Sequence, residues 1–584
     1  MYGVEREINF DLSPVKEIAG TEAYTGCDAI VNIIAGQIKA RRDPKTVLVF
    51  DYYHGVNENK ILNGIIRKLQ PDHLIDSNDF KYPEEIIQEK FGHFITDDRI
   101  FGVFSWGTIA EYFDQDKIRA IQEKIENATG LVVVYGVAAS VVMQGDITVS
   151  CNISLQEIKN RYAKGMDNWG AGNYDDDPLS KEKRALFLEF RMQNLHKRTV
   201  LKTMDFMIDC NRDEDFVMIS RMVFDKAVTT FASSPFKLVP IFTKGIWGGS
   251  WSQEVLGAGK DLPNIAWGIT GLMDWQAVRA KCGDAVVEFP STDLYFYNPK
   301  DILGRKIFYL YGYKCPIHVN FLDTWGGENL SLQVHPTLDY AHDVFNSHYG
   351  HYESYYMLDT TEESTVYLGT KTGVKLDELA AAFEAAQESG EFDDEKYINQ
   401  FPMKKHDHVF IPSGTIHASG RNTLALEIDL FCFATFKLWD WGRVDYDGKP
   451  RPINIRHGKH VIQEEFQTEF IKDNMISKQQ EIMRGDGWRK ERSGTMPYEA
   501  PMEVMRYWLT KSVHLETDGG IVILVLVEGE EAIVESPVYD FEPVILHYAE
   551  AMFVPARVGQ YTIQPYGKSK GKEIAILECF NKIG

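Results

Sequence analysis

The chain carries Leu332-Gln333-Val334-His335-Pro336 near its middle and, further along, Ile411-Pro412-Ser413-Gly414-Thr415-Ile416-His417. The glutamine and histidine of the first phrase stand two residues apart, so on a strand they face the same side. The Pro-Ser-Gly turn of the second phrase would lead into a strand that carries its histidine. With Glu353 between the phrases, two imidazoles and two oxygen ligands suit zinc or another divalent transition metal. The pattern predicts a metal-binding barrel assembled from separate strands.

Composition sets the broad class. The chain has 584 residues, which predicts about three domains. It is 44% hydrophobic and 25% charged, as ordinary globular proteins are. The formal net charge of -23 argues against a nucleic-acid partner and against an anionic membrane surface, although a small basic pocket is compatible with it.

The sequence also predicts a cytoplasmic location. The N-terminus has no basic start followed by an apolar core, and no apolar run is long enough for a bilayer. The seven cysteines are scattered and odd in number, and none forms a close C-x-x-C pair. Reduced thiols of the cytosol fit this usage better than a disulfide framework.

Residues 1–235 predict an α/β domain. Short apolar strands, such as 46–50 and 131–137, alternate with helical patterns at 116–128 and 181–207. This alternation favours a parallel sheet covered by helices. The basic run at 181–184 is interpreted as a solvated helix face.

The same block faintly resembles P-loop nucleoside kinases. A phosphate loop needs G-x-x-x-x-G-K-[ST], in which glycines let backbone amides surround phosphates. Placed on Lys60, the motif has His54 and Asn59 for its glycines and Ile61 for its hydroxyl. The resemblance therefore implies a degenerate kinase-like domain without ATP chemistry, and Lys60 alone is typical of a surface lysine.

Two strand-rich blocks follow, predicted as domains at 236–499 and 500–584. The first has a helical insertion at about 375–389. The phrase Met552-Phe553-Val554-Pro555-Ala556 in the second block echoes Val409-Phe410-Ile411-Pro412-Ser413 in the first. Aligned by proline, the second copy has Gln560 where the first has His417, so we expect a second barrel without metal that serves in packing.

From about Phe242 to the C-terminus, the chain resembles the class I mannose-6-phosphate isomerases, cupin-type double barrels with one catalytic zinc. Besides the metal phrases, the markers are Trp247-Gly248-Gly249, Trp439-Asp440-Trp441-Gly442-Arg443 and Pro450-Arg451-Pro452, in the family's order. The resemblance implies an all-β cupin double barrel after the α/β domain. It also implies interconversion of an aldose and a ketose, as phosphates or free sugars, through an enediol.

The resemblance further implies a set of site residues. The metal ligands would be Gln333, His335, Glu353 and His417, and the substrate would contact Ser331, Trp247 and Arg443. An alternative for Arg443 and Arg451 is a structural ion pair. Other histidines of this region lack such support, namely His342, His348, His351, His406 and His408; the last two are expected to be solvated strand-edge residues.

Several family positions have changed. Where the family reads like E-I-Q-Q-S-S-D-x-x-Y-R, this chain has Glu427-Ile428-Asp429-Leu430-Phe431-Cys432-Phe433-Ala434-Thr435-Phe436-Lys437. Glu427 is kept as a proton-transfer or positioning group, and Lys437 replaces an arginine without its bidentate fork. Phe433 replaces an aspartate, and a hydrophobic ring cannot accept a proton.

Further changes affect positive charge. Asn320 replaces a family lysine, His351 stands near the position of another, and Gly268 replaces a family acid. Losing a fixed cation opposite a phosphate costs roughly 2–5 kcal/mol. The leading hypothesis is therefore a metal-dependent sugar or sugar-phosphate isomerase with altered substrate recognition.

Three alternatives remain. The first is a non-catalytic carbohydrate-binding or regulatory cupin protein that keeps a structural metal. The second is a bifunctional kinase–isomerase, which requires ATP to bind the first domain. The third is a cupin oxygenase, a weaker fit because such iron sites usually contain no glutamine. The sequence does not set the substrate, the metal used in the cell or the oligomeric state.

Overall fold

The computed structural model describes residues 8–430, 434–494, 497 and 500–582. The chain forms two compact units. One comprises Val15–Phe231 and Asp274–Asn298, and the other comprises Met1–Pro14, Ala232–Met273 and Pro299–Gly584. The segment 274–298 thus belongs with the N-terminal unit, while the division into domains at 1–235, 236–499 and 500–584 remains a prediction.

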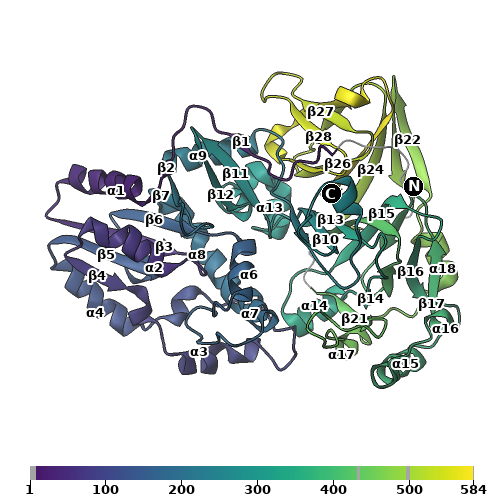
Figure 1. Ribbon diagram of the computed structural model, residues 1–584, viewed down its shortest axis with the longest axis horizontal. Helices are drawn as coiled ribbons and strands as arrows, with labels where there is room; N and C mark the ends of the chain where they lie inside the picture. Colours follow the sequence, from purple (N-terminus) through teal and green to yellow (C-terminus); the bar gives the residue numbers. More distant parts are fainter. Residues whose placement is uncertain (1–7, 431–433, 495–496, 498–499, 583–584) are drawn as a thin grey trace. The chain divides into compact units, whose positions relative to one another are not determined.

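The N-terminal unit is built on a seven-stranded, mixed sheet flanked by helices (Figure 1). Its strands lie in the order β2 (Tyr24–Thr25), β8 (Val217–Ser220), β7 (Phe206–Asp209), β6 (Ile147–Asn152), β3 (Lys45–Tyr52), β5 (Gly130–Val137) and β4 (His73–Asp76). The strands from β7 to β4 run parallel, whereas β8 pairs antiparallel with β7 and β2 pairs antiparallel with β8. The central strands are buried along almost their whole length, as helices on both faces require. The predicted parallel sheet is confirmed for the five strands from β7 to β4, but the sheet as a whole is mixed.

The helices of this unit follow its strands along the chain. They are α1 (Cys27–Arg41), α2 (Glu58–Gly64), α3 (Glu84–Phe91), α4 (Gln115–Glu126), α5 (Ala139–Val142), α6 (Leu155–Ala163), α7 (Pro178–Arg184), α8 (Phe190–Thr203) and α9 (Arg221–Ala232). A three-stranded sheet of β1 (Lys16–Glu17), β11 (Ala277–Cys282) and β12 (Ala285–Pro290), followed by α11 (Thr292–Tyr297), belongs to the same unit.

The helix predicted at 181–207 is partly wrong. A π-helical turn at Ala185–Glu189 interrupts it, and α8 ends at Thr203. The last predicted residues instead form β7, because Phe206 and Met207 pair in register with Val149 and Ser150 of the buried sheet. Tertiary pairing here overrides a local helical pattern.

The described residues of the C-terminal unit form four antiparallel sheets (Figure 1). The first has the order β18 (His408–Ile411), β15 (Tyr352–Thr360), β20 (Thr423–Leu430), β13 (Ile317–Asp323), β10 (Trp267–Gly271) and β9 (Ile241–Thr243). The second has the order β17 (Ile398–Pro402), β16 (Thr365–Thr370), β19 (His417–Ser419), β14 (Leu332–Val334) and β21 (Phe436–Trp439). The predicted helical insertion is confirmed as α15 (Leu376–Ser389).

The last two sheets share one apolar core. One has the order β22 (Gln479–Gly485), β23 (Trp488–Ser493), β24 (Met502–Leu509), β31 (Ile574–Asn581), β26 (Val522–Glu528) and β29 (Ala551–Val554). The other has the order β25 (Val513–Glu516), β30 (Gln560–Pro565), β27 (Glu531–Glu535) and β28 (Val544–His547). Leu524 of the former and Ile563 of the latter are both fully buried in this core. Burial of one face of each sheet stabilises the pair.

Candidate metal centre

Strand register in the second sheet aligns three of the predicted side chains. Gln333 on β14 lies directly opposite His417 on β19 and directly opposite Lys437 on β21. Directly paired residues of antiparallel strands project to the same face. The sheet therefore presents Lys437, Gln333 and His417 as one cross-strand row.

The first sheet contributes Glu353, on β15. Its Oε2 lies 2.9 Å from Nε2 of His335 and 2.9 Å from Nε2 of His417. The amide nitrogen assigned to Gln333 lies 3.2 Å from Nε2 of His417, and the two ends of this amide are interchangeable in assignment. His335, Glu353 and His417 each offer a ligand atom within 4.8 Å of the others, so the structure brings the four predicted ligands together.

Both histidines are held in one orientation by the backbone. Nδ1 of His335 donates to the carbonyl oxygen of Ala434 at 3.1 Å, and Nδ1 of His417 donates to that of Thr415 at 2.9 Å. In the neutral imidazole this places the lone pair on Nε2, which faces Glu353. His335 is 2% exposed, and Glu353 and His417 are fully buried.

The electrostatics of this group favour a cation. Burial, with the neighbouring His351, lowers the pKa of His335 to about 4. Burial raises the pKa of Glu353, but the adjacent His417 and His335 outweigh it and hold that pKa well below its usual value. A neutral His335 and an ionised Glu353 would direct a lone pair and an anionic oxygen at each other.

The donor set fits a divalent transition metal. Two imidazole nitrogens, a carboxylate and an amide oxygen are ligands that zinc accepts, and the second nitrogen of each ring is already used by a carbonyl. Oε1 of Glu353 is buried without a hydrogen-bond partner in the described part of the chain. These residues could therefore hold a zinc ion through His335, Glu353, His417 and Gln333.

A polar row crosses the first sheet beside Glu353. Glu427 on β20 lies opposite Asn320 of β13 on one side and Tyr355 of β15 on the other. Burial, then the carboxylate of Glu353, raises the pKa of Glu427 well above its usual value. Asn320 Oδ1 and the Tyr355 hydroxyl are buried and have no hydrogen-bond partner among the described residues. The structure thus places Glu427 close to the metal-capable group.

A second row contains residues that sequence reasoning missed. Asp429 lies opposite His318 and opposite Glu353. Its Oδ1 is 3.4 Å from Nδ1 of His318, and its Oδ2 is 3.6 Å from Nε2 of His351. The His351 ring lies 3.7 Å, centroid to centroid, from that of His335. The signal available in the sequence was alternation, because each of these residues is two positions from another site residue.

Two of the three predicted substrate contacts, Ser331 and Arg443, lie in an internal ion-pair cluster. Arg443 pairs with Asp440 at 2.5 Å, and Arg451 pairs with the other oxygen of Asp440 at 2.7 Å. Ser331 Oγ donates to Asp440 at 2.9 Å and accepts from Arg451. Burial and the neighbouring Arg451 lower the pKa of Lys437 to about 8. Contact of Ser331 and Arg443 with a substrate remains a prediction.

Packing accounts for one predicted substrate contact and one altered family position, and another altered position lies outside the described residues. Trp247 is fully buried and meets Trp267 edge-on, with ring centroids 4.7 Å apart. A Cβ added at Gly268 would lie 2.9 Å from the ring of Phe321, so no larger side chain fits there without movement. Phe433 is the position outside the described residues.

The expected exposure of one histidine is wrong. His408 is 1% exposed, because it begins the buried strand β18 and pairs across it with the buried Tyr356 of β15. Burial, together with the charge of Arg506, lowers its pKa to about 3. His406 is partly buried, and its Nδ1 is hydrogen-bonded to the Tyr356 hydroxyl at 2.8 Å.

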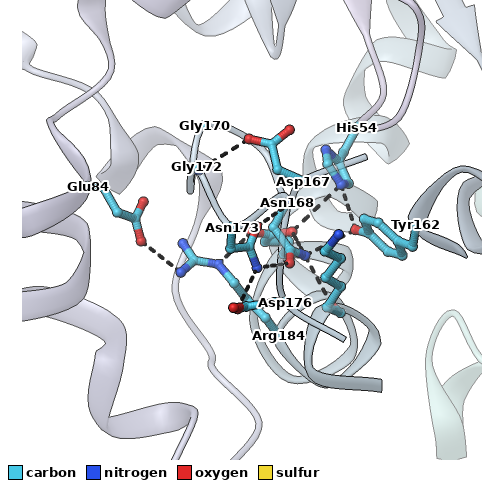
Figure 2. Close-up of polar contacts among 12 residues, drawn as sticks. His54, Glu84, Tyr162, Asp167, Asn168, Gly170, Gly172, Asn173, Asp176 and Arg184 are labelled. Atoms are coloured by element: carbon cyan, nitrogen blue, oxygen red, sulfur yellow. Dashed lines mark hydrogen bonds and ion pairs between the residues drawn. The ribbon is translucent and has the colours of Figure 1, made fainter. Parts of the chain in front are cut away.

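Residues of α6 and α8 in the N-terminal unit form hydrogen bonds with the loop after β3. The backbone N–H of His54 donates to the side chain of Gln193 at 2.8 Å. Figure 2 shows the His54 ring directed at Tyr162, with Nε2 2.6 Å from the hydroxyl. Lys60 is exposed and pairs with Glu214.

The basic run at 181–184 is not a solvated face, contrary to the prediction. Lys181 and Lys183 are 1% and 7% exposed and donate to backbone carbonyls. Arg184 bridges Glu84 at 2.7 Å and the fully buried Glu189 at 2.9 Å, part of which is visible in Figure 2. These charges stabilise an interior network because each has a partner.

None of the helices in the described part of the chain is both long and apolar enough to span a bilayer.

Comparison with known proteins gives two kinds of match. A family model described as a domain of unknown function, DUF8485, matches residues 26–233. The chain is 25% identical over 343 residues to the mannose-6-phosphate isomerase ManA of Bacillus subtilis (strain 168). The aligned region covers 58% of this chain and 98% of ManA. It is 28% identical over 235 residues to the probable mannose-6-phosphate isomerase GmuF of the same organism, which covers 39% of this chain and 68% of GmuF.

Among solved structures, the mannose 6-phosphate isomerase from Bacillus subtilis aligns with a TM-score of 0.48 and 20% identity, over 59% of this chain and 99% of that chain. The chain is distantly similar in sequence to mannose-6-phosphate isomerases over 58% of its length, and it carries a buried His335, Glu353 and His417 group that could hold a metal.

Proposed function

We propose that the protein is a metal-dependent isomerase that interconverts an aldose and a ketose, as free sugars or phosphates, in a cupin-type barrel. The observation that carries this proposal is the convergence of Nε2 of His335 and Nε2 of His417 on one oxygen of Glu353. Distant similarity to mannose-6-phosphate isomerases supports the reaction class.

The neighbouring residues supply the groups that such a reaction needs. A bound divalent cation would stabilise negative charge that develops on substrate oxygens during enediol formation. Glu427 holds a carboxyl group beside the metal-capable residues and would move the proton between adjacent carbons. Lys437, opposite Gln333, would place a positive charge near the substrate.

The test compares ligand variants with a matched histidine control. His335→Ala and His417→Ala should lose aldose–ketose exchange and bound zinc, measured by sugar analysis and atomic spectroscopy. His342→Ala, which removes an exposed ring whose side chain is 61% accessible, should retain both. Exchange at the wild-type rate in either ligand variant would contradict the metal mechanism.

A non-catalytic carbohydrate-binding protein is the second proposal. It is favoured by Asn320 in place of a lysine and by Gly268, where packing excludes an acid. The two proposals separate in one measurement on the zinc-loaded chain. Saturable binding of mannose or mannose 6-phosphate without any exchange would favour the second over the first.

For the N-terminal unit we propose a kinase-like topology without ATP chemistry. The first long strand, β3, lies at the centre, with β5 and β6 on its two sides. The loop after it therefore stands where the strand order reverses, the place where doubly wound sheets bind ligands. Backbone amides of this loop form hydrogen bonds within the loop. For example, the N–H of Val56 donates to the carbonyl oxygen of Tyr53 at 3.3 Å.

A further inference from the structure

The last two sheets of the C-terminal unit border a half-open cavity of about 630 Å³. Its lining comes from β22, β23, β24, β25, β26, β30 and β31, from the loop at 517–521, and from Lys306 and Lys582. This volume lies within the range of about 300–1,000 Å³ that small-molecule sites occupy. Residues 500–584 were predicted to serve in packing, and packing does not require a space of this size.

A buried carboxyl group forms part of the wall. Glu578 is 4% exposed. Its Oε2 accepts from the Tyr507 hydroxyl at 3.1 Å, and its Oε1 accepts from the Tyr561 hydroxyl at 3.2 Å. Lys490 Nζ lies 3.9 Å away. Burying a carboxyl group costs stability, and an apolar residue would satisfy the core equally well. The arrangement therefore indicates a role other than packing.

The remaining lining is aromatic and electrically balanced. Trp488, Tyr507 and Phe580 offer flat apolar surfaces, and Lys490 lies 5.0 Å from the centre of the Tyr507 ring. The charged residues that line the cavity comprise three lysines and three acids, namely Lys306, Lys490, Lys582, Glu516, Asp518 and Glu578. A balanced lining with flat apolar walls favours a neutral ligand that has both polar edges and apolar faces.

The internal repeat connects this cavity with the metal-capable group. Gln560, which stands where the first copy has His417, lines the cavity and donates from Nε2 to Glu516 at 2.8 Å. We propose that this cavity binds a neutral saccharide, whose ring face stacks on Trp488 and whose hydroxyl groups pair with Glu578 and Lys490. This inference does not rest on the isomerase reaction.

The experiment uses the full-length, zinc-loaded chain and D-mannose, D-glucose, D-fructose and maltose as probes, with binding measured by saturation-transfer NMR and titration calorimetry. At least one sugar should bind saturably to the wild type. Binding should persist in His417→Ala, in which the metal-capable group is disrupted. Trp488→Leu and Glu578→Gln should weaken binding about tenfold or more, which corresponds to about 1.4 kcal/mol.

Matched controls are Trp508→Leu and Glu535→Gln, which alter partly buried residues outside the cavity lining and should leave affinity unchanged. If Glu578→Gln does not fold, as thermal denaturation would show, Trp488→Leu alone decides. Absence of saturable binding for all four sugars would overturn the proposal. So would sugar binding that is lost in His417→Ala and kept in Trp488→Leu.

Discussion

The two strand-rich regions of the C-terminal unit use the same strand–proline–turn phrase for different interiors. In the earlier region the phrase at 409–413 leads to His417, which meets Glu353 and His335. In the later region the phrase at 552–556 leads to Gln560, an exposed residue at the edge of a cavity that has one buried carboxyl group in its wall. The comparison shows that the strand and turn determine where a side chain is placed, and that the identity of this side chain determines the chemistry.

The largest expected effect concerns the earlier region. Glu427→Gln removes the group proposed to move the proton while keeping its size. We expect kcat for aldose–ketose exchange to fall by about 10²-fold or more, since positioned acid–base groups contribute typically 10²–10⁴-fold. The measurement is steady-state exchange with the sugar that the wild type converts best. The exposed Glu363→Gln is the control, and zinc content should stay constant in both variants.

An unchanged kcat in Glu427→Gln, with zinc retained, would assign proton transfer to another residue and weaken the contrast between the two interiors.

The next effect concerns stability in the later region. Glu550 is 2% exposed and accepts from His547 and from Lys237, whose Nζ lies 2.8 Å away. Burial raises its pKa, but these partners outweigh it and lower the pKa from 4.5 to about 2. A carboxyl group whose pKa is lowered in the folded state stabilises the fold at pH values above its pKa in the unfolded chain. That stability is lost as the pH falls from 4.5 through about 2.

We therefore expect Glu550→Gln to reduce the free energy of unfolding at pH 7 by about 3 kcal/mol. Urea denaturation at a series of pH values measures it. The difference between wild type and variant should shrink as the pH is lowered from neutral toward the acid range. A difference independent of pH would show that packing, and not charge, dominates at this position.

A smaller effect tests the comparison directly. Gln560→His restores a histidine at the position that corresponds to His417. We expect zinc to remain at one ion per chain, because a stable site needs at least three ligands and one imidazole supplies only one. Atomic spectroscopy of the purified variant measures this. A second equivalent of zinc would show that the later region has a metal site that lacked only this one ligand.

The smallest effect is expected in the N-terminal unit. Lys60→Ala removes the lysine that aligns with a phosphate loop, but this side chain is exposed and already paired with Glu214. We expect calorimetry to detect no magnesium-dependent ATP binding in either wild type or variant. Heat of ATP binding in the wild type that disappears in Lys60→Ala would instead support the bifunctional kinase–isomerase.

Much of the local structure was predictable from pattern. The apolar runs at 46–50 and 131–137 became β3 and β5, and the alanine-rich insertion became α15. The pattern was less informative where charge is buried. Lys181 and Lys183 look like surface residues because the sequence does not show that their amines meet backbone carbonyls.

The candidate site divides in the same way. The sequence by itself determined the types and order of Gln333, His335, Glu353 and His417, because zinc chemistry limits which side chains can serve. Only the tertiary structure decided that Asp429 lies between His318 and His351, and that Asp440 engages both Arg443 and Arg451. The physical reason is that side-chain spacing along a strand is local, whereas the partner across a sheet depends on register between segments far apart in the chain.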